Sequence, residues 1–493
     1  MSVRSSRSMP PKPAGEAHRV LVVGGGGAGL AAAIGAAQAG ARVTLLEQAK
    51  HLGGTTRMAV GSITAAGTRL QAQHGITDDV EAFRHDMDEF TADLLPHDNA
   101  QLRALLAREA GRTVDWLEAL GVVFLGPFAE PPHRVPRMHN AVPGASTVIR
   151  RLERQARTLG VDVICNVHEV RLWRESSGLS GLEYQHASSP GPVRLAGPVI
   201  LATGDFSGNT LWRTRWLPET AAKARPINPA NLGFGHELAF AEGAYGLNMS
   251  MIFGPQLRFP RSPHPGWLDR LPDWPWLMRL GARFLERAPS WALRRLAKPL
   301  LIANMSPAPE LFAAGARLVD ANGCQLTAAA AADAVAHSPG NQAFILLNQE
   351  LAARFSRPPY AVSTAPGIAY AYIPDYLRGR PDIAFRVSNQ AALAARLGLA
   401  PSALAESLQG WEDEPIIVLG PVHAMLTTTE GSLAVDDQLR VLSSDGSPIT
   451  GLFAAGCVGQ GGLLLRGHGL HWAWTFTSGR LAGHHAACLT MQT

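Results

Sequence analysis

The sequence has few of the features that mark metal-binding, disulfide-rich or membrane-spanning proteins. Its 493 residues include four cysteines, Cys165, Cys324, Cys457 and Cys488, which lie far apart and form no CxxC pair. This spacing predicts neither a metal site nor a disulfide framework, and it is typical of a protein of the reducing cytoplasm. No uninterrupted apolar run reaches the roughly 18 residues needed to cross a bilayer.

The chain also lacks a strong excess of charge of either sign. Its 44 Lys and Arg residues against 40 Asp and Glu leave a net charge of +4, which is too small to predict a nucleic-acid partner. Residues 1–17 contain Ser, Arg and Pro without an apolar stretch. We therefore expect a disordered tail there rather than a secretory signal.

Glycine, in contrast, is concentrated near the start of the chain. Gly24, Gly26 and Gly29 form a GxGxxG pattern between an apolar strand pattern and an Ala-rich helix pattern, the context that distinguishes a dinucleotide fingerprint from a chance match. A second strand pattern ends about 20 residues later at Glu47, where an acid accepts hydrogen bonds from a ribose. The pattern predicts a Rossmann-like βαβ unit that binds a pyrophosphate at its helix N-terminus.

Patterns along the rest of the chain predict two domains. Helix patterns at 30–40, 79–120 and 146–159 alternate with strand patterns at 18–24, 42–47, 161–173 and 193–204, and strands return after residue 416. This order predicts an α/β fold. We assign residues 18–250 and 423–493 to the two segments of one Rossmann-like dinucleotide-binding domain, and residues 251–422 to an inserted α+β capping domain with a basic, Trp-rich insertion at 255–310.

Small residues after the βαβ unit favour FAD over NAD as the dinucleotide. Gly53-Gly54-Thr55-Thr56 and Gly61 form a second region of small side chains, which leaves room for the flavin end of the cofactor. No zinc-type or other metal motif accompanies them.

These motifs together resemble the flavoprotein superfamily of soluble fumarate reductases, succinate dehydrogenase flavoprotein subunits and 3-ketosteroid dehydrogenases. The resemblance rests on VVGGGGAGLAAAIGAAQAGARVTLLE (22–47), GGTTRMAVGSITAAGT (53–68), VILATGDFSGN (199–209), PITGLFAAG (448–456) and GRLAG (479–483). It implies hydride exchange between flavin N5 and a carbon of an activated C–C bond. It places FAD contacts at Gly24, Gly26, Ala28, Gly29, Glu47, Gly54, Thr55, Thr56, Gly61, Val167, Thr203, Gly204, Gly456, Gly469 and Leu470.

The chain departs from the resembled family at several positions. Asp205 stands where many relatives have glycine, and Cys457 stands where they often have glutamate. Some relatives attach flavin through a histidine in the segment that here reads TTRMAVG (55–61), so we expect FAD to be bound non-covalently. The segment at 318–333 contains no arginine, although the resemblance implies a proton-donating arginine in this part of the cap.

Arg466 falls on the substrate-binding arginine of the family. A single guanidinium suits one carboxylate or one carbonyl oxygen, and the histidines implied for a dicarboxylate clamp are missing near 251–255 and at Thr428. We therefore expect a small-molecule substrate that is apolar, ketosteroid-like or another enone, to be desaturated or reduced next to its carbonyl, with an external electron acceptor or donor. Fumarate-like reduction of an unsaturated carboxylate and an electron-transfer subunit that serves a quinone or a partner protein remain the alternatives.

The proton that accompanies the hydride needs an acid or a base. Histidine is favoured because its pKa lies near neutrality, and His468 and His471 lie in RGHGLHW, close to Arg466. His423 and Tyr370 are further candidates. For each of these four side chains a structural role is the competing interpretation.

Residues 276–302 combine tryptophan, other apolar residues and arginine at near-helical spacing. Such helices bind the headgroup layer of anionic membranes, or they pack their apolar side on a protein core. Both interpretations stay open, and the first predicts a cytoplasmic protein that is peripheral at the inner membrane face.

Overall fold

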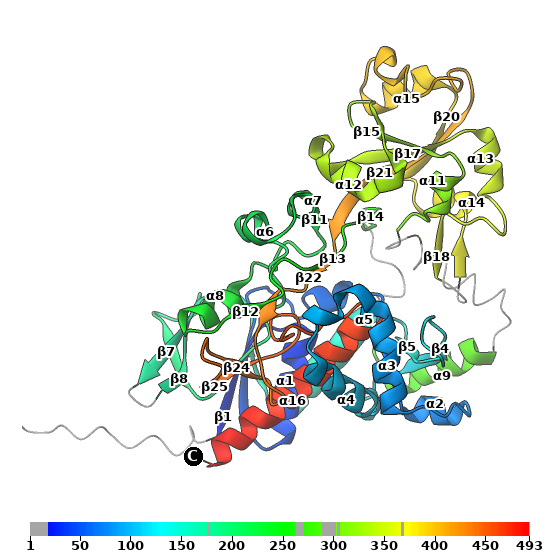
Figure 1. Cartoon of the computed structure of the whole chain (residues 1–493). Helices are drawn as coiled ribbons and strands as arrows, with labels where there is room; N and C mark the ends of the chain where they lie inside the picture. The colour runs from blue at the N-terminus through cyan, green and yellow to red at the C-terminus, as the bar shows by residue number, and fades with distance from the viewer. Residues whose placement is uncertain are drawn as a thin grey trace, which may run out of the picture.

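We describe the protein from a computed structural model in which residues 18–175, 178–262, 271–287, 302, 306–365 and 369–492 are defined (Figure 1). The tail predicted at 1–17 and most of the second half of the helix pair predicted at 276–302 lie outside these ranges.

A six-stranded sheet forms the centre of the larger domain, with the strand order β24-β25-β10-β1-β2-β6. Every neighbouring pair is parallel except β24 and β25. The predicted Rossmann-like arrangement is confirmed. The strands are β1 (Arg19–Val23), β2 (Arg42–Leu46), β6 (Asp162–Ile164), β10 (Val199–Leu201), β24 (Arg440–Leu442) and β25 (Pro448–Ala454).

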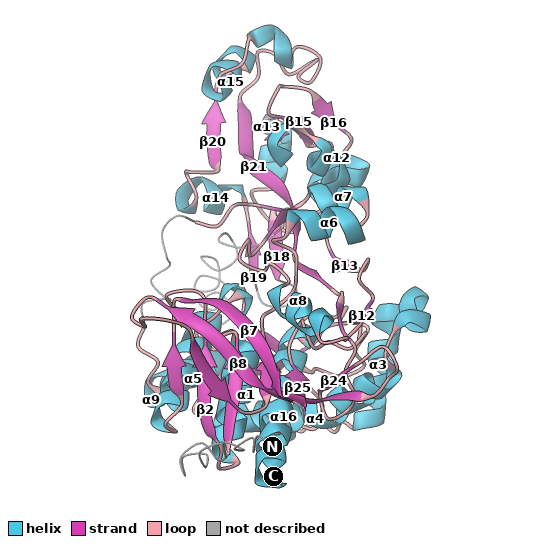
Figure 2. Cartoon of the chain, turned by 90° about the vertical axis from the view of Figure 1, so that its left-hand side faces the viewer, coloured by secondary structure: helices cyan, strands magenta, loops and turns pink. Residues whose placement is uncertain are grey.

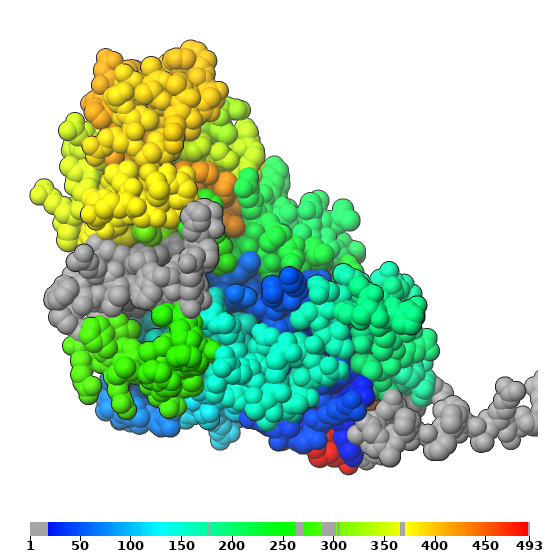
Figure 3. Space-filling view, turned by 180° about the vertical axis from the view of Figure 1, so that it is seen from behind, coloured from blue at the N-terminus to red at the C-terminus, as the bar shows by residue number. Residues whose placement is uncertain are grey.

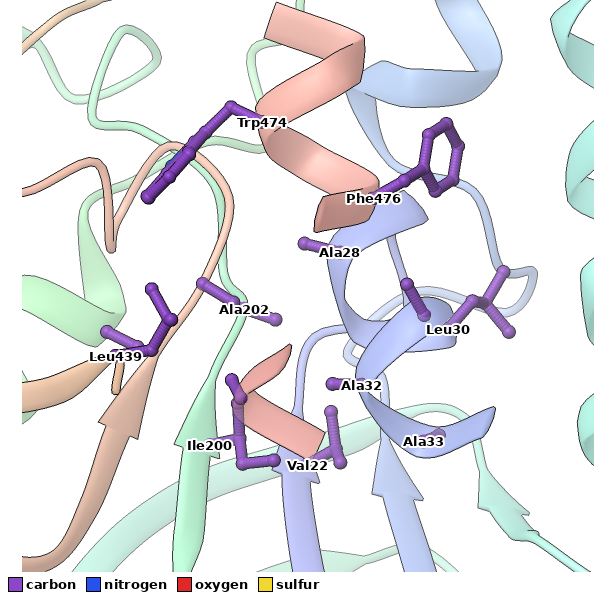
Figure 4. Close-up of a cluster of buried hydrophobic side chains, with 14 of the residues drawn as sticks. Val22, Ala28, Leu30, Ala32, Ala33, Ile200, Ala202, Leu439, Trp474 and Phe476 are labelled. Carbon is purple, nitrogen blue, oxygen red and sulfur yellow. The ribbon is translucent and has the colours of Figure 1, made fainter. Parts of the chain in front are cut away.

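Helix α1 (Gly27–Gln38) and the C-terminal helix α16 (Leu470–Gln492) pack against each other, and both contact this sheet (Figure 4). The two helices approach closely because glycines lie at their crossing: a Cβ at Gly483 would lie 2.1 Å from the carbonyl oxygen of Ala32. Trp474 and Phe476 of α16 are buried beside Ala28 of α1. The other helices of the larger domain are α2 (Arg69–Gln73), α3 (Val80–Thr91), α4 (Ala100–Ala119), α5 (Ala145–Thr158) and α8 (Phe234–Ala241).

Two strands predicted as continuous are broken. The 161–173 pattern divides into β6 and β7 (Val167–Glu175), because Asn166 adopts a φ of 57° between them. The 193–204 pattern divides into β9 (Val193–Ala196) and β10 at Gly197, whose φ is 137°. Strands β7, β8 (Gly178–His186) and β9 form a separate antiparallel sheet. The chain therefore changes direction at Asn166 and at Gly197, which the apolar pattern did not predict.

The cap is built on the long strand β21 (Ile416–Leu426), which runs down toward the larger domain and leads into β22 (Thr428–Thr429) (Figures 1 and 2). Its sheet contains β11 (Arg225–Pro226), β14 (Gln256–Arg258), β15 (Arg317–Asp320), β16 (Gln325–Leu326), β17 (Ala343–Leu347) and β20 (Ala384–Val387). The cap helices are α11 (Glu310–Ala313), α12 (Ala331–His337), α13 (Gln349–Arg354), α14 (Ile373–Gly379) and α15 (Gln390–Leu397).

Short elements join the two parts of the molecule. Helices α6 (Thr210–Trp216) and α7 (Glu219–Lys223) precede β11, and two small pairs follow: β12 (Gly246–Leu247) with β23 (Ser432–Leu433), and β13 (Ile252–Phe253) with β22. A hairpin of β18 (Ser363–Ala365) and β19 (Ala369–Ala371) belongs to the cap. Figure 3 shows the cap stacked over the larger domain. The domain boundaries at residues 250 and 423 stay a prediction.

Helix α9 (Pro275–Arg287) lies against the sheet of β3 (Ser62–Thr64), β4 (Phe124–Phe128) and β5 (Met138–Ala141), on the outside of the larger domain (Figure 1). Met278 and Ala282 are its buried residues and pack with Val123. Within the described ranges, no helix combines the length and the apolar character needed to cross a bilayer.

Candidate active site

A cavity of about 1020 Å³ opens along the carboxyl ends of the parallel strands. Its wall is formed by the residues that directly follow β1, β2, β10 and β25. This is the edge at which open α/β sheets bind their ligands.

The three glycines of the fingerprint have different roles at this edge. A Cβ at Gly24, whose φ is 104°, would lie 2.4 Å from the carbonyl oxygen of Ala202, and a Cβ at Gly29 would lie 1.8 Å from the carbonyl oxygen of Gly24. These two positions therefore require glycine for packing. A Cβ at Gly26 would meet no atom within 4 Å, and Gly26 lines the cavity at the N-cap of α1.

The N-terminus of α1 suits a diphosphate. Gly26 supplies no capping side chain, and the first turn contains no acidic residue, so the positive end of the helix dipole faces the cavity. Thr56 Oγ1 accepts a hydrogen bond from the N–H of Gly27 (3.2 Å). Within the described part of the chain, the buried Thr203 Oγ1 on the same wall has no hydrogen-bond partner, which leaves it available to a ligand.

Glu47 is held in place at the end of β2. Its Oε2 accepts a hydrogen bond from the N–H of Gly25 (2.6 Å), and its Oε1 accepts one from the N–H of Ala49 (2.8 Å). Both contacts fix the carboxylate on the cavity wall beside Val167. The position fits a ribose, because a fixed carboxylate accepts hydrogen bonds from vicinal hydroxyls.

The strand order defines the two ends of the cavity. Since β2 and β6 lie on one side of β1 and β25 lies on the other, a dinucleotide with its ribose at Glu47 extends toward the residues after β25. That end is lined by Phe253, Thr427, Thr428, Cys457, His471 and Trp472. Burial raises the pKa of the Cys457 thiol to about 12, so the thiol is neutral there.

Comparison with known proteins agrees with this geometry. A family model described as FAD binding domain matches residues 19–464. The chain belongs to this family. It is an FAD-dependent oxidoreductase, and the position of FAD in this cavity stays a prediction.

One curated relative matches almost end to end. Vinyl phenol reductase from Lactiplantibacillus plantarum is 25% identical in an alignment of 527 positions, gaps included. The alignment covers 97% of this chain and 98% of that protein. The probable fumarate reductase Ifc3 from Shewanella frigidimarina is 32% identical, but the match covers 39% of this chain and only 33% of that protein. Among solved structures, the open conformation of a flavocytochrome c3 fumarate reductase has a TM-score of 0.71 at 23% identity, with 97% of this chain and 80% of that chain covered. This structural likeness supports the fold.

Most residues predicted to bind FAD lie on the cavity wall. These are Gly24, Gly26, Ala28, Glu47, Gly54, Thr55, Thr56, Val167, Thr203, Gly204 and Gly456. Gly29, Gly61, Gly469 and Leu470 do not belong to the wall. The contacts predicted for all of these residues with FAD stay predictions.

Asp205 has a clear structural role that glycine lacks. Its carboxylate accepts hydrogen bonds from Thr428 Oγ1 (2.7 Å), the N–H of Thr429 (2.9 Å) and Asn231 Nδ2 (2.6 Å). Asn231 in turn donates to Thr55 Oγ1 (3.0 Å). The side chain therefore connects three segments around the FAD cavity, and this explains why a buried acid is tolerated there.

The structure places only His471 of the predicted catalytic residues on the cavity wall. His468 is exposed, and its Nδ1 contacts Glu130 Oε1 at 2.5 Å. The hydrogen bond to this carboxylate raises the pKa of His468. This contact holds His468 away from the cavity wall.

His423 and Tyr370 lie in the cap, away from the cavity wall. His423 is buried on β21, where its Nδ1 contacts the carbonyl oxygen of Asn341 (2.7 Å) and its Nε2 faces Arg225 Nη1 (3.3 Å). Tyr370 is partly exposed on β19.

Arg466 lies behind the wall rather than on it. Its positive charge acts on two neighbours: it lowers the pKa of His471 and opposes the rise in the pKa of Glu430. Its predicted contact with substrate stays a prediction.

Sequence reasoning missed several charged residues around the cavity, among them Arg57, Arg261 and Glu430. Arg57 and Arg261 line the wall, and Arg261 of the cap donates a hydrogen bond to the carbonyl oxygen of Met58. Glu430, two residues after Thr428, is fully buried. Arg57 lies inside the small-residue segment at 53–68, so the sequence could have predicted that it lies near the cofactor. The local sequence around Arg261 and Glu430 contains no feature that predicts a position at the cavity.

Proposed function

We propose that the protein reduces a C–C double bond conjugated with a carbonyl group or an aromatic ring in an apolar substrate. FAD supplies the hydride exchange when it is bound. The proposal rests on the composition of the end of the cavity beyond β25, where Phe253 and Trp472 provide apolar surface and His471 provides an imidazole. A wall of this kind favours an apolar substrate with one polar group over a small dicarboxylate.

The relatives support the same choice. The match to vinyl phenol reductase spans nearly all of both chains, whereas the match to the fumarate reductase Ifc3 spans about a third of each. The longer sequence match therefore favours an alkene attached to a ring or an enone over fumarate. The names of the relatives also favour reduction over desaturation.

The residues on the wall have separable tasks in this reaction. Arg261 and Arg57 place positive charge at the cavity, where a guanidinium stabilises oxygen that gains negative charge in the transition state. His471 can transfer the proton that accompanies the hydride.

The test is anaerobic reoxidation of the chemically reduced holoenzyme. A panel of 4-vinylphenol, an unsaturated 3-ketosteroid, urocanate and fumarate is added in turn, and return of the oxidised-flavin absorbance is followed. We expect the apolar alkenes to reoxidise the flavin. Fastest reoxidation by fumarate would instead support a dicarboxylate reductase, and reoxidation by quinones alone would support an electron-transfer subunit.

We propose further that FAD is held non-covalently. The segment Thr55–Gly61 contains no histidine, and the buried Thr203 Oγ1 on the wall has no hydrogen-bond partner among the described residues. Acid precipitation is expected to release the yellow cofactor into the supernatant. Flavin that stays with the protein pellet would contradict this.

We also propose that α9 docks the protein on an anionic membrane surface. Trp276, Leu280 and Phe284 are 61%, 59% and 62% exposed, and their spacing of four residues places them on one side of the helix. The exposed Arg279 and Arg283 form a neighbouring stripe. Exposed tryptophan beside arginine complements the charge and the apolar layer of anionic lipid.

Vesicle flotation tests this contact. Wild type is expected to float with vesicles that contain phosphatidylserine, less with phosphatidylcholine alone, and less at high salt. Phe284→Ser should weaken flotation, whereas Leu211→Ser, which changes a side chain that is 81% exposed on α6, should not. Equal flotation of both variants would refute the contact.

A further inference from the structure

A cluster of buried polar side chains lies directly behind the end wall of the FAD cavity. Glu430 has no exposed surface, and its Oε2 accepts a hydrogen bond from Gln460 Nε2. Its Oε1 lies 3.7 Å from His471 Nε2. Among the described residues, neither Oε1 nor Nε2 has a hydrogen-bond partner. Two buried polar atoms without partners therefore face each other.

A proton shared between Glu430 Oε1 and His471 Nε2 accounts for two buried atoms that otherwise lack a partner among the described residues. An ionised carboxylate without full hydration or hydrogen bonding is costly in a protein interior, and so is a buried imidazole nitrogen without a partner. A proton on Glu430 Oε1 removes the charge and gives His471 Nε2 a donor. The gap of 3.7 Å is longer than a hydrogen bond, so a small side-chain movement completes the contact.

The charges around the pair leave this proton available near neutral pH. Burial raises the pKa of Glu430 to about 7; Asp98 adds to the rise, while Arg466 and Gln460 oppose it. Burial and Arg466 lower the pKa of His471 to about 4. Near neutral pH the imidazole is therefore neutral and the carboxyl group is partly protonated.

His471 connects this pair to the cavity. About 25% of its side chain is exposed, and it lines the wall. Since Nε2 is buried, the exposed part is another edge of the ring. Of the other titratable groups at this end, Cys457 holds its proton too tightly to exchange it near neutral pH.

We propose that Glu430 and His471 form a proton relay between the protein interior and the reacting carbon of the substrate. His471 gives its Nδ1 proton to the carbon adjacent to the one that receives the hydride, and it takes up the Glu430 proton on Nε2. A new C–H bond forms, an N–H and an O–H bond break, and a new N–H bond forms. Glu430 is left as a carboxylate near Arg466 and is reprotonated from water. This step rests on the proposed function, which supplies the hydride.

The kinetic test compares wild type, Glu430→Gln and the control Glu109→Gln. Glu109 is a buried carboxylate paired with Arg480 away from the cavity. With an alkene that reoxidises the reduced holoenzyme, we expect the wild-type rate to fall as the pH rises through about 7, because the protonated carboxyl is the donor. Glu430→Gln should be slower by about a hundredfold, the typical loss of a general acid, and should lose this pH dependence. Glu109→Gln should keep it.

A second measurement needs no substrate. Infrared difference spectra of the wild-type holoenzyme with isotopically labelled glutamate should show a carboxylic acid band that titrates near neutral pH and is missing in Glu430→Gln. If no alkene reoxidises the flavin, the proposed function fails while this titration still decides whether Glu430 holds the proton. The relay is overturned if no such band exists, or if Glu430→Gln keeps both its rate and its pH profile.

Discussion

The crossing of α1 and α16 gives the most direct test of the packing around the FAD site. A Cβ added at Gly483 would lie 2.1 Å from the carbonyl oxygen of Ala32, whereas ordinary contacts begin at 3.4 Å. In Gly483→Ala, α16 therefore has to retreat by about 1 Å, because the neighbouring backbone of α1 cannot rotate away. Such overpacking costs about 1–3 kcal/mol of the free energy of unfolding.

The control is the same substitution in an open helix position. Gly281 lies inside α9, and a Cβ there would meet no atom within 4 Å. Gly281→Ala is therefore expected to stabilise the protein by about 0.5–1 kcal/mol through helix propensity. The two variants should differ in sign when urea unfolding is followed at saturating FAD.

The displacement should also reach the cofactor. His471, Trp472 and Thr475 at the start of α16 line the cavity, so Gly483→Ala is expected to bind FAD more weakly in an equilibrium titration of the apoprotein. Gly281→Ala should bind FAD as wild type does. The reasoning is refuted if Gly483→Ala is as stable as Gly281→Ala and retains the wild-type FAD affinity.

Three further predictions concern single polar groups. Glu47→Gln removes a fixed anionic acceptor and should weaken FAD binding by about 1.5–3 kcal/mol. Glu237 is exposed, and Glu237→Gln should leave FAD binding unchanged. Titration of the two apoproteins with FAD measures the difference. Asp205→Asn places an amide among donors that now contact a carboxylate, and urea unfolding should show a loss of about 1–3 kcal/mol; unchanged stability would contradict the network. Burial lowers the pKa of His236 to about 4, so the unfolded chain binds its proton first as the pH falls. Neutral His236 therefore contributes fully to the free energy of unfolding above about pH 6.5, and about 3 kcal/mol of this free energy is lost as the pH falls to about 4. In His236→Phe, the free energy of unfolding should fall by about 3 kcal/mol less over the same pH range.

The sequence by itself determined the dinucleotide-binding half of the protein. An apolar strand, the glycines of the fingerprint and an acid at the end of the second strand lie within about 30 residues, the span of one βαβ unit, and local rules of chain geometry act over such distances. The same is true of α3, α4 and α5, whose apolar spacing predicted helices that are present.

Only the tertiary structure decided what surrounds the reacting end of the cavity. Asn166 and Gly197 broke two predicted strands because the chain leaves one sheet for another there, which an apolar pattern does not encode. His471 was one histidine among several candidates until its position on the wall separated it from His468 and His423. Glu430 lies beside His471 although the two are 41 positions apart in the sequence. The end of β22 and the beginning of α16 come together at the same cavity. Proximity of this kind comes from the packing of distant segments, and the packing also creates the burial that gives the pair its chemistry.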